Sequence, residues 1–310
     1  MIDVINNNLN NVKAEVEEVL STSPLIIRSY TKHLLKGQGK YIRAISVLTS
    51  AMDDNHEIHP DAIHFAAAIE ILHLATLVHD DVMDGADYRR GISTLHKEYG
   101  HKTAIICGDY LLAVALNLVN KTQQKHEYLD YDLSNYMLEI ALGELTQHLN
   151  NGNYNIKVAE YLEIIRGKTA ALFEASFVAG ILSTADASAL ESYKLLGHNL
   201  GMIFQLVDDC IDFEVSDEDA KKPTQSDFEQ GVITLPLISA LEKAGRQFKQ
   251  LTRLEVNALV KEYGGLEMTK EKAQSYYDQA QTILNDMNLD AIKKNVLQNL
   301  FDLAMGYLND

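Results

Sequence analysis

The spacing of apolar residues along the chain predicts helices almost throughout. Apolar positions recur at helical intervals, and only four prolines interrupt them. The predicted helical ranges are 11–20, a second stretch ending at Leu35, 61–84, 102–119, 133–149, 158–182, 186–214, 234–244, 255–262, 268–285 and 290–308. The range 61–84 is apolar on nearly all sides, as expected of a buried central helix. We therefore expect an all-α fold.

No segment has the pattern of a strand or of an interdomain linker. Residues 232–236 include β-branched side chains, but the segment is short and ends at a proline, which does not suit a sheet. The one long polar interruption, 216–231, has the character of a functional loop. Without a fixed-period repeat or a low-complexity tract, the chain is expected to form one domain over 1–310, a bundle of about ten helices.

Composition narrows the possible partners. The chain has 44 acidic and 27 basic residues, and its net charge of -17 argues against nucleic acid. We expect no transmembrane segment, because no stretch has the length and apolarity of a bilayer span, and only peripheral membrane contact. Cys107 and Cys210 lie in apolar helical stretches without metal-ligand spacing. This indicates reduced, buried thiols and a cytoplasmic protein.

Two five-residue segments share the pattern Asp-Asp-x-x-Asp. Their members are Asp80, Asp81 and Asp84, and then Asp208, Asp209 and Asp212. Residues four apart lie on one face of a helix, so each segment projects two mutually repelling carboxylates in one direction. One such run is usually a solvated helix end, but both runs follow strongly apolar stretches, so we expect a cation there. Carboxylate oxygens favour Mg²⁺, while His79, with no second histidine at a suitable spacing, is assigned to helix packing.

Basic residues indicate what the metal ions would hold. They are Lys40, Arg43, Arg89, Arg90, Lys168 and Lys222. Each one alone would be read as a surface charge. Arg89 and Arg90 are adjacent and therefore point in different directions, which suits two separate anionic groups in neighbouring sites. Two diphosphates would satisfy this arrangement.

Seven segments, in this order, give the chain a close resemblance to the trans-polyprenyl diphosphate synthase family. They are GQGKYIR, HDDVMDGADYRRG, GDYLLA, GELTQ, GKTAALF, FQLVDDCIDF and KPTQSDFEQGVITLPLISAL, and they cover about residues 35–240. The chain resembles the catalytic subunits that make heptaprenyl or hexaprenyl diphosphate. This resemblance implies an isoprenoid-synthase-type helical bundle with a large central cavity. It also implies an enzyme that condenses isopentenyl diphosphate with geranyl or farnesyl diphosphate.

The resemblance implies roles for individual residues. About three Mg²⁺ ions would be bound directly by Asp80, Asp84 and Asp208. The metal-bound waters would be ordered by Asp81, Asp209 and Asp212. The allylic diphosphate would be held by Arg89, Lys168 and Lys222. Isopentenyl diphosphate would be held by Lys40, Arg43, His73 and Arg90. The reacting carbons would face Thr169 and Gln205.

Product length is also indicated by the family pattern. Ala75 and Thr76 lie about one helical turn before the first aspartate segment. In having small residues at these positions, the chain resembles family members whose product channel is open. The resemblance indicates an all-trans product of about six to eight five-carbon units, of the kind used as a quinone side chain. Three residues depart from the family pattern: Tyr41 replaces a common arginine, Ala44 a common proline, and Val232 a common lysine.

Three other functions are less consistent with these residues. A class I terpene cyclase ionises an allylic diphosphate but needs no second diphosphate site, which Lys40, Arg43 and Arg90 disfavour. A subunit that only modulates another synthase would be expected to have lost one aspartate segment. A helical scaffold would carry both segments as solvated faces. The resemblance implies a homodimer formed through apolar helix faces, with a heterodimer containing a different small subunit as the alternative.

Overall fold

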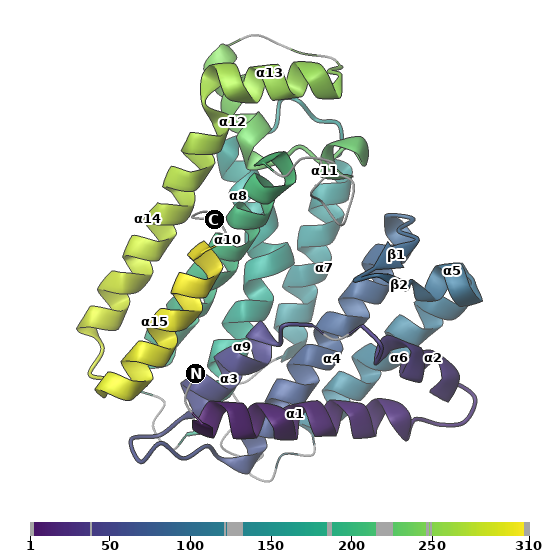
Figure 1. The fold of residues 1–310 in the computed structure, drawn as a ribbon, viewed down its shortest axis with the longest axis vertical. Coiled ribbons are helices and arrows are strands. Elements are labelled where there is room, and N and C mark those ends of the chain that lie inside the picture. Colours follow the sequence, from purple (N-terminus) through teal and green to yellow (C-terminus); the bar gives the residue numbers. More distant parts are fainter. Residues whose placement is uncertain are drawn as a thin grey trace. The chain divides into compact units, whose positions relative to one another are not determined.

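The structure is a computed structural model that describes residues 3–37, 39–120, 122, 133–184, 188–214, 226–245, 248 and 250–306. The chain divides into two compact units, each of which is described by itself. Unit 1 comprises Met1–Leu133 with Ala175–Tyr193, and unit 2 comprises Ser134–Glu174 with Lys194–Asp310. Helices dominate both units (Figure 1), so the predicted all-α class is confirmed. The single domain over 1–310 and its central cavity stay predictions.

Unit 1 is organised around the long helix α4, Pro60–Met83. It packs chiefly against α6, His101–Val119, and also against α3, Ile42–Ala51, and α1, Asp3–Ser21 (Figure 1). Several sides of α4 are buried, because the five successive residues 65–69, which span more than one helical turn, all have an exposed fraction of 0%. Burial on several sides explains why the sequence of α4 lacks a polar face.

The small elements of unit 1 correct the sequence analysis. The helix α2, Arg28–Leu34, agrees with the predicted stretch ending at Leu35, whereas α5, Leu95–Tyr99, and the antiparallel strands β1, Tyr88–Arg89, and β2, Ile92–Ser93, were not predicted. The expectation of no strand was wrong at this hairpin. Its two-residue turn requires positive φ at both positions, and Arg90 has φ 51° and Gly91 φ 77°. Strands of two residues are too short to show an alternating pattern. The helices α3 and α5 were also missed.

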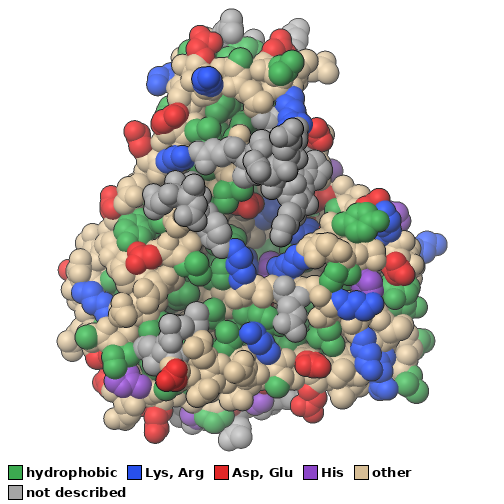
Figure 2. All heavy atoms as spheres, in the orientation of Figure 1, with side chains coloured by type: hydrophobic (Ala, Val, Ile, Leu, Met, Phe, Trp, Pro, Cys, Tyr) green, Lys and Arg blue, Asp and Glu red, His purple; other side chains and the backbone are tan. Residues whose placement is uncertain are grey.

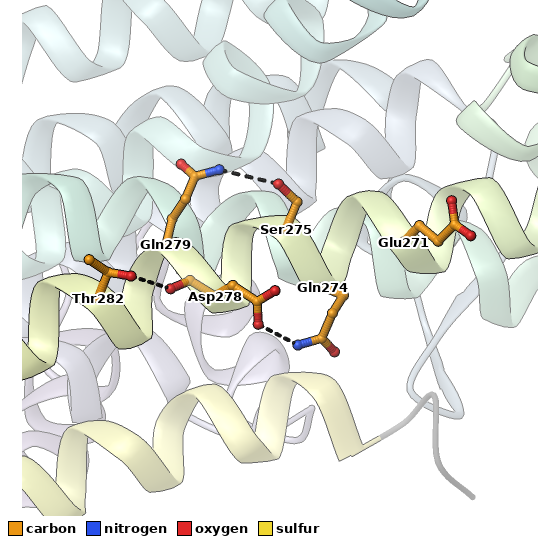
Figure 3. A pocket seen from close by; sticks show the side chains of 6 residues that line it. All are labelled: Glu271, Gln274, Ser275, Asp278, Gln279 and Thr282. Atoms are coloured by element: carbon orange, nitrogen blue, oxygen red, sulfur yellow. Dashed lines mark hydrogen bonds between the residues drawn. The ribbon is translucent and has the colours of Figure 1, made fainter.

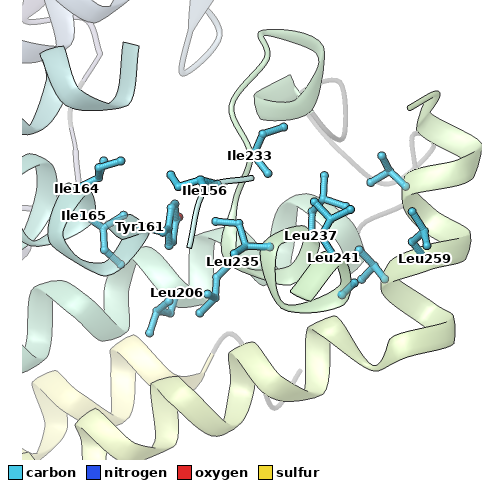
Figure 4. Close-up of a cluster of buried hydrophobic side chains, with 14 of the residues drawn as sticks. Ile156, Tyr161, Ile164, Ile165, Leu206, Ile233, Leu235, Leu237, Leu241 and Leu259 are labelled. Carbon is cyan, nitrogen blue, oxygen red and sulfur yellow. The ribbon is translucent and has the colours of Figure 1, made fainter. Parts of the chain in front are cut away.

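Unit 2 contains most of the chain's second half. Its elements are α7, Leu133–Leu149, α8, Val158–Ile165, a π-helical turn η1, Arg166–Ala170, the start of α9, Ala171–Leu182, most of α10, Leu190–Glu214, α11, Ser226–Glu229, α12, Leu235–Ala244, α13, Arg253–Tyr263, α14, Gly265–Asp286, and α15, Ala291–Gly306. Apolar side chains from α8, α10, α12 and α13 form one buried cluster, which includes Ile164, Leu206 and Leu237 (Figure 4). This cluster anchors α10, which carries the second aspartate segment.

The predicted helix over 158–182 is three elements, because η1 interrupts it. Of the predicted loop at 216–231, only 226–231 lies within the described residues, and α11 begins there. Residues 232–236 contain no strand, as expected. Acidic, basic and apolar side chains are interspersed over the face shown in Figure 2.

Two further expectations concern thiols and membranes. Cys107 and Cys210 are both buried and neither forms a disulfide, as predicted. By length and composition alone, α4 and α6 are apolar enough to cross a membrane. The same composition is typical of a core helix in a folded domain, and α4 is packed against α1, α3, α5 and α6 of unit 1.

Candidate active site

The first aspartate segment lies at the end of α4. The backbone amide of Asp84, the C-cap residue, donates to the carbonyl oxygen of Asp80 at 2.8 Å, so the helical spacing of these two residues is retained. Asp80 is half-buried and Asp84 is exposed. Asp81 is buried, and its Oδ1 accepts from Nε of Arg89 at 2.6 Å. Asp81 therefore ties the hairpin to α4, while its neighbours place acidic oxygens at the helix end.

A second polar cluster of unit 1 joins α3, α4 and the hairpin turn. Burial lowers the pKa of Arg43 to about 10, against the opposing charge of Glu70 and with a smaller contribution from the charge of Arg90. Burial also lowers the pKa of His73 well below its usual value, and Arg43, Arg90 and Arg89 add to this effect. The imidazole is therefore neutral at pH 7. The structure brings Arg43, His73 and Arg90 together, as the sequence predicted.

The glycine-rich segment before α3 fits around Arg90. Nη1 of Arg90 donates to the carbonyl oxygen of Gly37 at 3.0 Å. A Cβ atom on Gly39 would lie 2.7 Å from the same nitrogen, so a larger residue here would displace the guanidinium group of Arg90 from its present position. Lys40 follows and is exposed. A cavity of about 50 Å³ is lined here by residues that include Tyr41 and Arg90.

The second aspartate segment lies on α10 in unit 2. Asp209 is fully buried, and its Oδ2 accepts from the Tyr161 hydroxyl at 2.5 Å. Its Oδ1 accepts from Nε2 of Gln205 at 3.0 Å, and Oε1 of Gln205 accepts from the Thr169 hydroxyl at 2.8 Å. Asp208 is exposed and Asp212 is half-buried. The predicted neighbours Thr169 and Gln205 are thus in contact, and Asp209 is held by a hydrogen-bonded chain.

Asp227 is a residue that the sequence analysis missed. It lies on α11, and its negative charge raises the pKa of both Tyr161 and Asp209, as does that of Asp208. This places Asp227 near the second aspartate segment. The available signal was an acidic residue at the end of the long polar loop. Lys222, in the same loop, lies outside the described residues.

Lys168 is carried by the π-helical turn η1. Its Nζ lies 3.0 Å from a carboxylate oxygen of Glu144 on α7. The backbones of α7 and η1 are in contact here, since a Cβ atom on Gly143 would lie 2.8 Å from the carbonyl carbon of Gly167. A π turn places one extra residue in a helix, and such turns are frequent at functional sites. The turn therefore sets the direction of Lys168.

His79 and the two predicted chain-length residues lie on α4. Nε2 of His79 lies 3.4 Å from Oδ1 of Asp109 and 3.3 Å from the carbonyl oxygen of Ile105, both on α6. These contacts suit the helix-packing role. Ala75 is fully buried, and the hydroxyl of half-buried Thr76 donates to the carbonyl oxygen of His73 at 2.8 Å. Their role in product length stays a prediction.

A shallow hollow of about 440 Å³ runs along α14 (Figure 3). Its lining residues are Glu271, Gln274, Ser275, Asp278, Gln279 and Thr282. Asp278 accepts hydrogen bonds from Gln274 at 2.8 Å and, through its backbone carbonyl, from Thr282 at 3.0 Å. The lining contains carboxylates but no Lys or Arg, so this hollow does not suit a diphosphate.

The aspartate segments fit magnesium as donor groups. Among the described residues, no three His, Cys, Asp or Glu side chains converge into a metal site by themselves. Mg²⁺ usually takes only one or two carboxylates and completes its shell with waters and substrate phosphates. The acidic oxygens of Asp80 and Asp84 in unit 1, and of Asp208 in unit 2, are therefore suitable partial ligand sets.

The buried carboxyl of Asp209 predicts a pH dependence of stability in the metal-free protein. Burial raises its pKa from 3.8 to about 8, and the hydrogen bonds from Tyr161 and Gln205 only partly oppose this. The folded state therefore holds the proton more tightly than the unfolded chain. The resulting stabilisation is complete below the unfolded pKa and is lost as pH rises through the folded pKa.

We expect the melting temperature measured in chelator to fall between pH 4 and pH 8 through this residue. The fall should be smaller in Asp209→Asn, whose side chain cannot ionise. Parallel curves for both proteins over this range would contradict the assignment.

An all-α protein with carboxylate pairs on two long helices and paired guanidinium groups beside a glycine-rich segment is suited to act on diphosphate esters. The comparison with known proteins narrows this class. The chain belongs to the polyprenyl synthetase family, whose model matches residues 24–263. The chain is therefore a prenyltransferase, as its sequence motifs predicted, and the terpene cyclase alternative is not favoured. The family generally depends on a divalent metal ion.

Three relatives illustrate the match. Geranylfarnesyl diphosphate synthase of Aeropyrum pernix is 31% identical, over 93% of this chain and 96% of its own length. Heptaprenyl diphosphate synthase component 2 of Bacillus subtilis is 33% identical, over 77% of this chain and 68% of its own. The crystal structure of a decaprenyl diphosphate synthase from Rhodobacter capsulatus superposes with a TM-score of 0.87 at 29% identity, covering 99% of this chain and 98% of that one.

Proposed function

We propose that this protein is a Mg²⁺-dependent polyprenyl diphosphate synthase with a medium-length to long all-trans product of about six to eight five-carbon units. One observation supports a reaction between two diphosphate substrates. The acidic end of α4 lies in unit 1, and the same unit also contains a separate cluster with Arg43, His73 and Arg90. A second cationic cluster suits the diphosphate of isopentenyl diphosphate, which a cyclase does not bind. The B. subtilis relative named for heptaprenyl synthesis supports the product length.

Bound Mg²⁺ would neutralise the charge that develops on the departing diphosphate as its bond to the allylic carbon breaks. Asp80, Asp84 and Asp208 would hold the metal ions, and Asp81, Asp209 and Asp212 would order their waters. The allylic diphosphate would be bound by Arg89, Lys168 and Lys222. In the structure Arg89 is paired with Asp81 and Lys168 with Glu144. These two carboxylates would keep the two cationic side chains oriented toward the diphosphate.

The remaining residues would position the nucleophile. Lys40, Arg43, Arg90 and the neutral His73 would hold isopentenyl diphosphate so that its double bond faces the allylic carbocation. Thr169 and Gln205, joined by their hydrogen bond, would face the reacting carbons. Loss of a proton from the condensed intermediate, taken up by the released diphosphate, then gives an allylic diphosphate five carbons longer.

The proposal is tested with the purified chain alone, Mg²⁺, radiolabelled isopentenyl diphosphate and farnesyl diphosphate. A ladder of extracted products ending near six to eight units is expected, and chelation of Mg²⁺ should abolish it. Absence of incorporation with geranyl, farnesyl and geranylgeranyl primers, from a folded protein, would reject the activity of the chain by itself.

Enlarging residue 75 is expected to shorten the product. Ala75→Phe would place a ring about one turn below the proposed metal site, where it would block a growing tail. Because Ala75 is fully buried, overpacking should also cost about 1–3 kcal/mol of stability. Thr76→Phe, at a half-buried position, provides a milder second variant. An unchanged product distribution in both would refute the placement of these residues in the channel.

We infer that the protein forms a homodimer. Helix α7 carries an exposed apolar stripe, in which successive leucines are spaced four, three and four residues apart as in helix–helix interfaces. Its members are 53–74% exposed: Leu138, Leu142, Leu145 and Leu149. On α6, Ile106 is 63% exposed. A dimer mass in light scattering, reduced to a monomer by Leu142→Glu, would support this. A monomer that is active only after addition of a different subunit would favour the heterodimer suggested by the "component 2" relatives.

We further expect a cytoplasmic enzyme that touches membranes only peripherally as its apolar product leaves. Leu25 and Ile26, in the turn before α2, are 83% and 87% exposed and offer an apolar contact. Co-flotation with anionic lipid vesicles, lost in Leu25→Ser, would support this contact.

A further inference from the structure

Glu70 is a carboxylate on α4 to which the mechanism above gives no role. It lies one helical turn before His73, is half-buried, and lines the same small cavity as Tyr41, His73 and Arg90. Its Oε1 accepts the backbone amide of Ala44 at 3.0 Å. Ala44 lies in the first turn of α3, directly after Arg43. Glu70 therefore connects α4 to the turn that presents Arg43.

The first turn of α3 depends on this contact because it has no cap of its own. Tyr41, the N-cap residue, is in the left-handed region with φ 55°, and its side chain makes no capping hydrogen bond. The first amides of a helix need acceptors, and a carboxylate there also stabilises the positive end of the helix dipole. Ala44, where the family commonly has proline, supplies an N–H group that proline would lack. Glu70 thus acts as a cap from a distant part of the sequence.

The charge of Glu70 also interacts with two guanidinium groups. Arg43 and Arg90 both act to lower the pKa of Glu70, although burial, the larger effect, raises it. Arg90 acts to lower the pKa of Arg43, which shows that the two cations repel each other. A carboxylate close to both offsets this repulsion. It allows two cations to stay near each other before an anionic substrate arrives.

We propose that Glu70 is the positioning residue of the isopentenyl diphosphate site. It holds the first turn of α3, and with it Arg43, and keeps Arg43 and Arg90 in place for a diphosphate that Glu70 itself does not touch. This inference rests on the proposed function, because it assigns that diphosphate to the Arg43 and Arg90 cluster.

The test compares Glu70→Ala with Glu70→Gln. Loss of the carboxylate in Glu70→Ala should raise KM for isopentenyl diphosphate about tenfold, since the amide of buried Ala44 loses its acceptor and two guanidinium groups lose a nearby opposite charge. KM for farnesyl diphosphate should change less than about twofold. Glu70→Gln keeps an acceptor for the Ala44 amide but loses the charge, so its KM for isopentenyl diphosphate should rise only about threefold.

The matched control is Glu174→Ala. Glu174 is a buried carboxylate of unit 2, with Oε1 3.0 Å from Nδ1 of His198. Its loss should lower the melting temperature without changing the ratio of the two KM values. Equal increases in both KM values in Glu70→Ala, or an unchanged KM for isopentenyl diphosphate in an active protein, would overturn the inference while leaving the proposed function intact.

If the wild-type chain shows no prenyl transfer, the proposed function fails separately. Calorimetric binding of isopentenyl diphosphate to the wild type and to Glu70→Ala then decides the inference. Tenfold weaker binding to the variant supports it, and equal binding, or none to the wild type, overturns it.

Discussion

Replacing Asp80 with asparagine is expected to lower kcat by about 10²- to 10³-fold, the usual cost of removing one group that stabilises developing negative charge. The asparagine side chain would occupy the same space at the end of α4 but would lack the charge that holds Mg²⁺. The departing diphosphate would then lose part of its neutralisation, and the allylic carbon–oxygen bond would break more slowly. Raising the Mg²⁺ concentration should recover part of the lost rate, measured as incorporation of labelled isopentenyl diphosphate.

Asp87→Asn is the matched control for this measurement. Asp87 is an exposed aspartate in the loop after α4 and pairs with Lys97, with 2.5 Å between Oδ2 and Nζ. This surface ion pair should contribute less than about 1 kcal/mol, and its loss should leave kcat within about twofold of the wild type. Retention of more than a tenth of the wild-type kcat in Asp80→Asn would contradict the assigned metal ligand.

The second large effect is expected at Gly143, where adding even a methyl group should lower the stability of the protein and weaken its binding of the allylic diphosphate. In Gly143→Ala the new Cβ atom would meet the backbone of Gly167 and Lys168, which cannot rotate away as a flexible side chain can. Separating α7 from η1 should cost about 1–3 kcal/mol of stability. It should also displace Lys168 from Glu144 and raise KM for the allylic diphosphate. Thermal unfolding and steady-state kinetics on one preparation would measure both.

Gly306→Ala serves as the control for this glycine. Gly306 is the last residue of α15, and a Cβ atom there would have no atom within 4 Å. Alanine is the better helix former, so the melting temperature should stay the same or rise slightly. A Gly143→Ala protein as stable and active as Gly306→Ala would show that α7 and η1 need not approach so closely.

The parts of the fold that the sequence predicted are the long helices with a regular apolar pattern. The range 133–149 coincides with α7, and 61–84 differs from α4 by one residue at each end. The polar contacts Thr169 with Gln205, and Arg43 with His73 and Arg90, also follow the predicted grouping. In these cases the helix bounds follow from the local apolar periodicity, and the grouping of site residues follows from the order of the motifs.

The missed features depend on contacts between distant residues. The helix α3 follows two glycines and Tyr41, and its first turn is completed by Glu70, 26 positions later. The hairpin at 88–93 is stabilised by the pairing of Arg89 with Asp81. The role of Asp227 depends on folding that brings α11 near Asp209. None of these contacts leaves a periodic pattern in the sequence.

The π turn at Arg166–Ala170 makes this region sensitive to chain length in a particular way. Deleting any one of its five residues would let α8 and α9 merge into a regular α-helix with better backbone hydrogen bonds. The two halves would then rotate against each other by roughly 100° about the helix axis. Such a shortened protein could be more stable and still be inactive, because Tyr161 before the turn and the start of α9 after it could no longer both face their present partners.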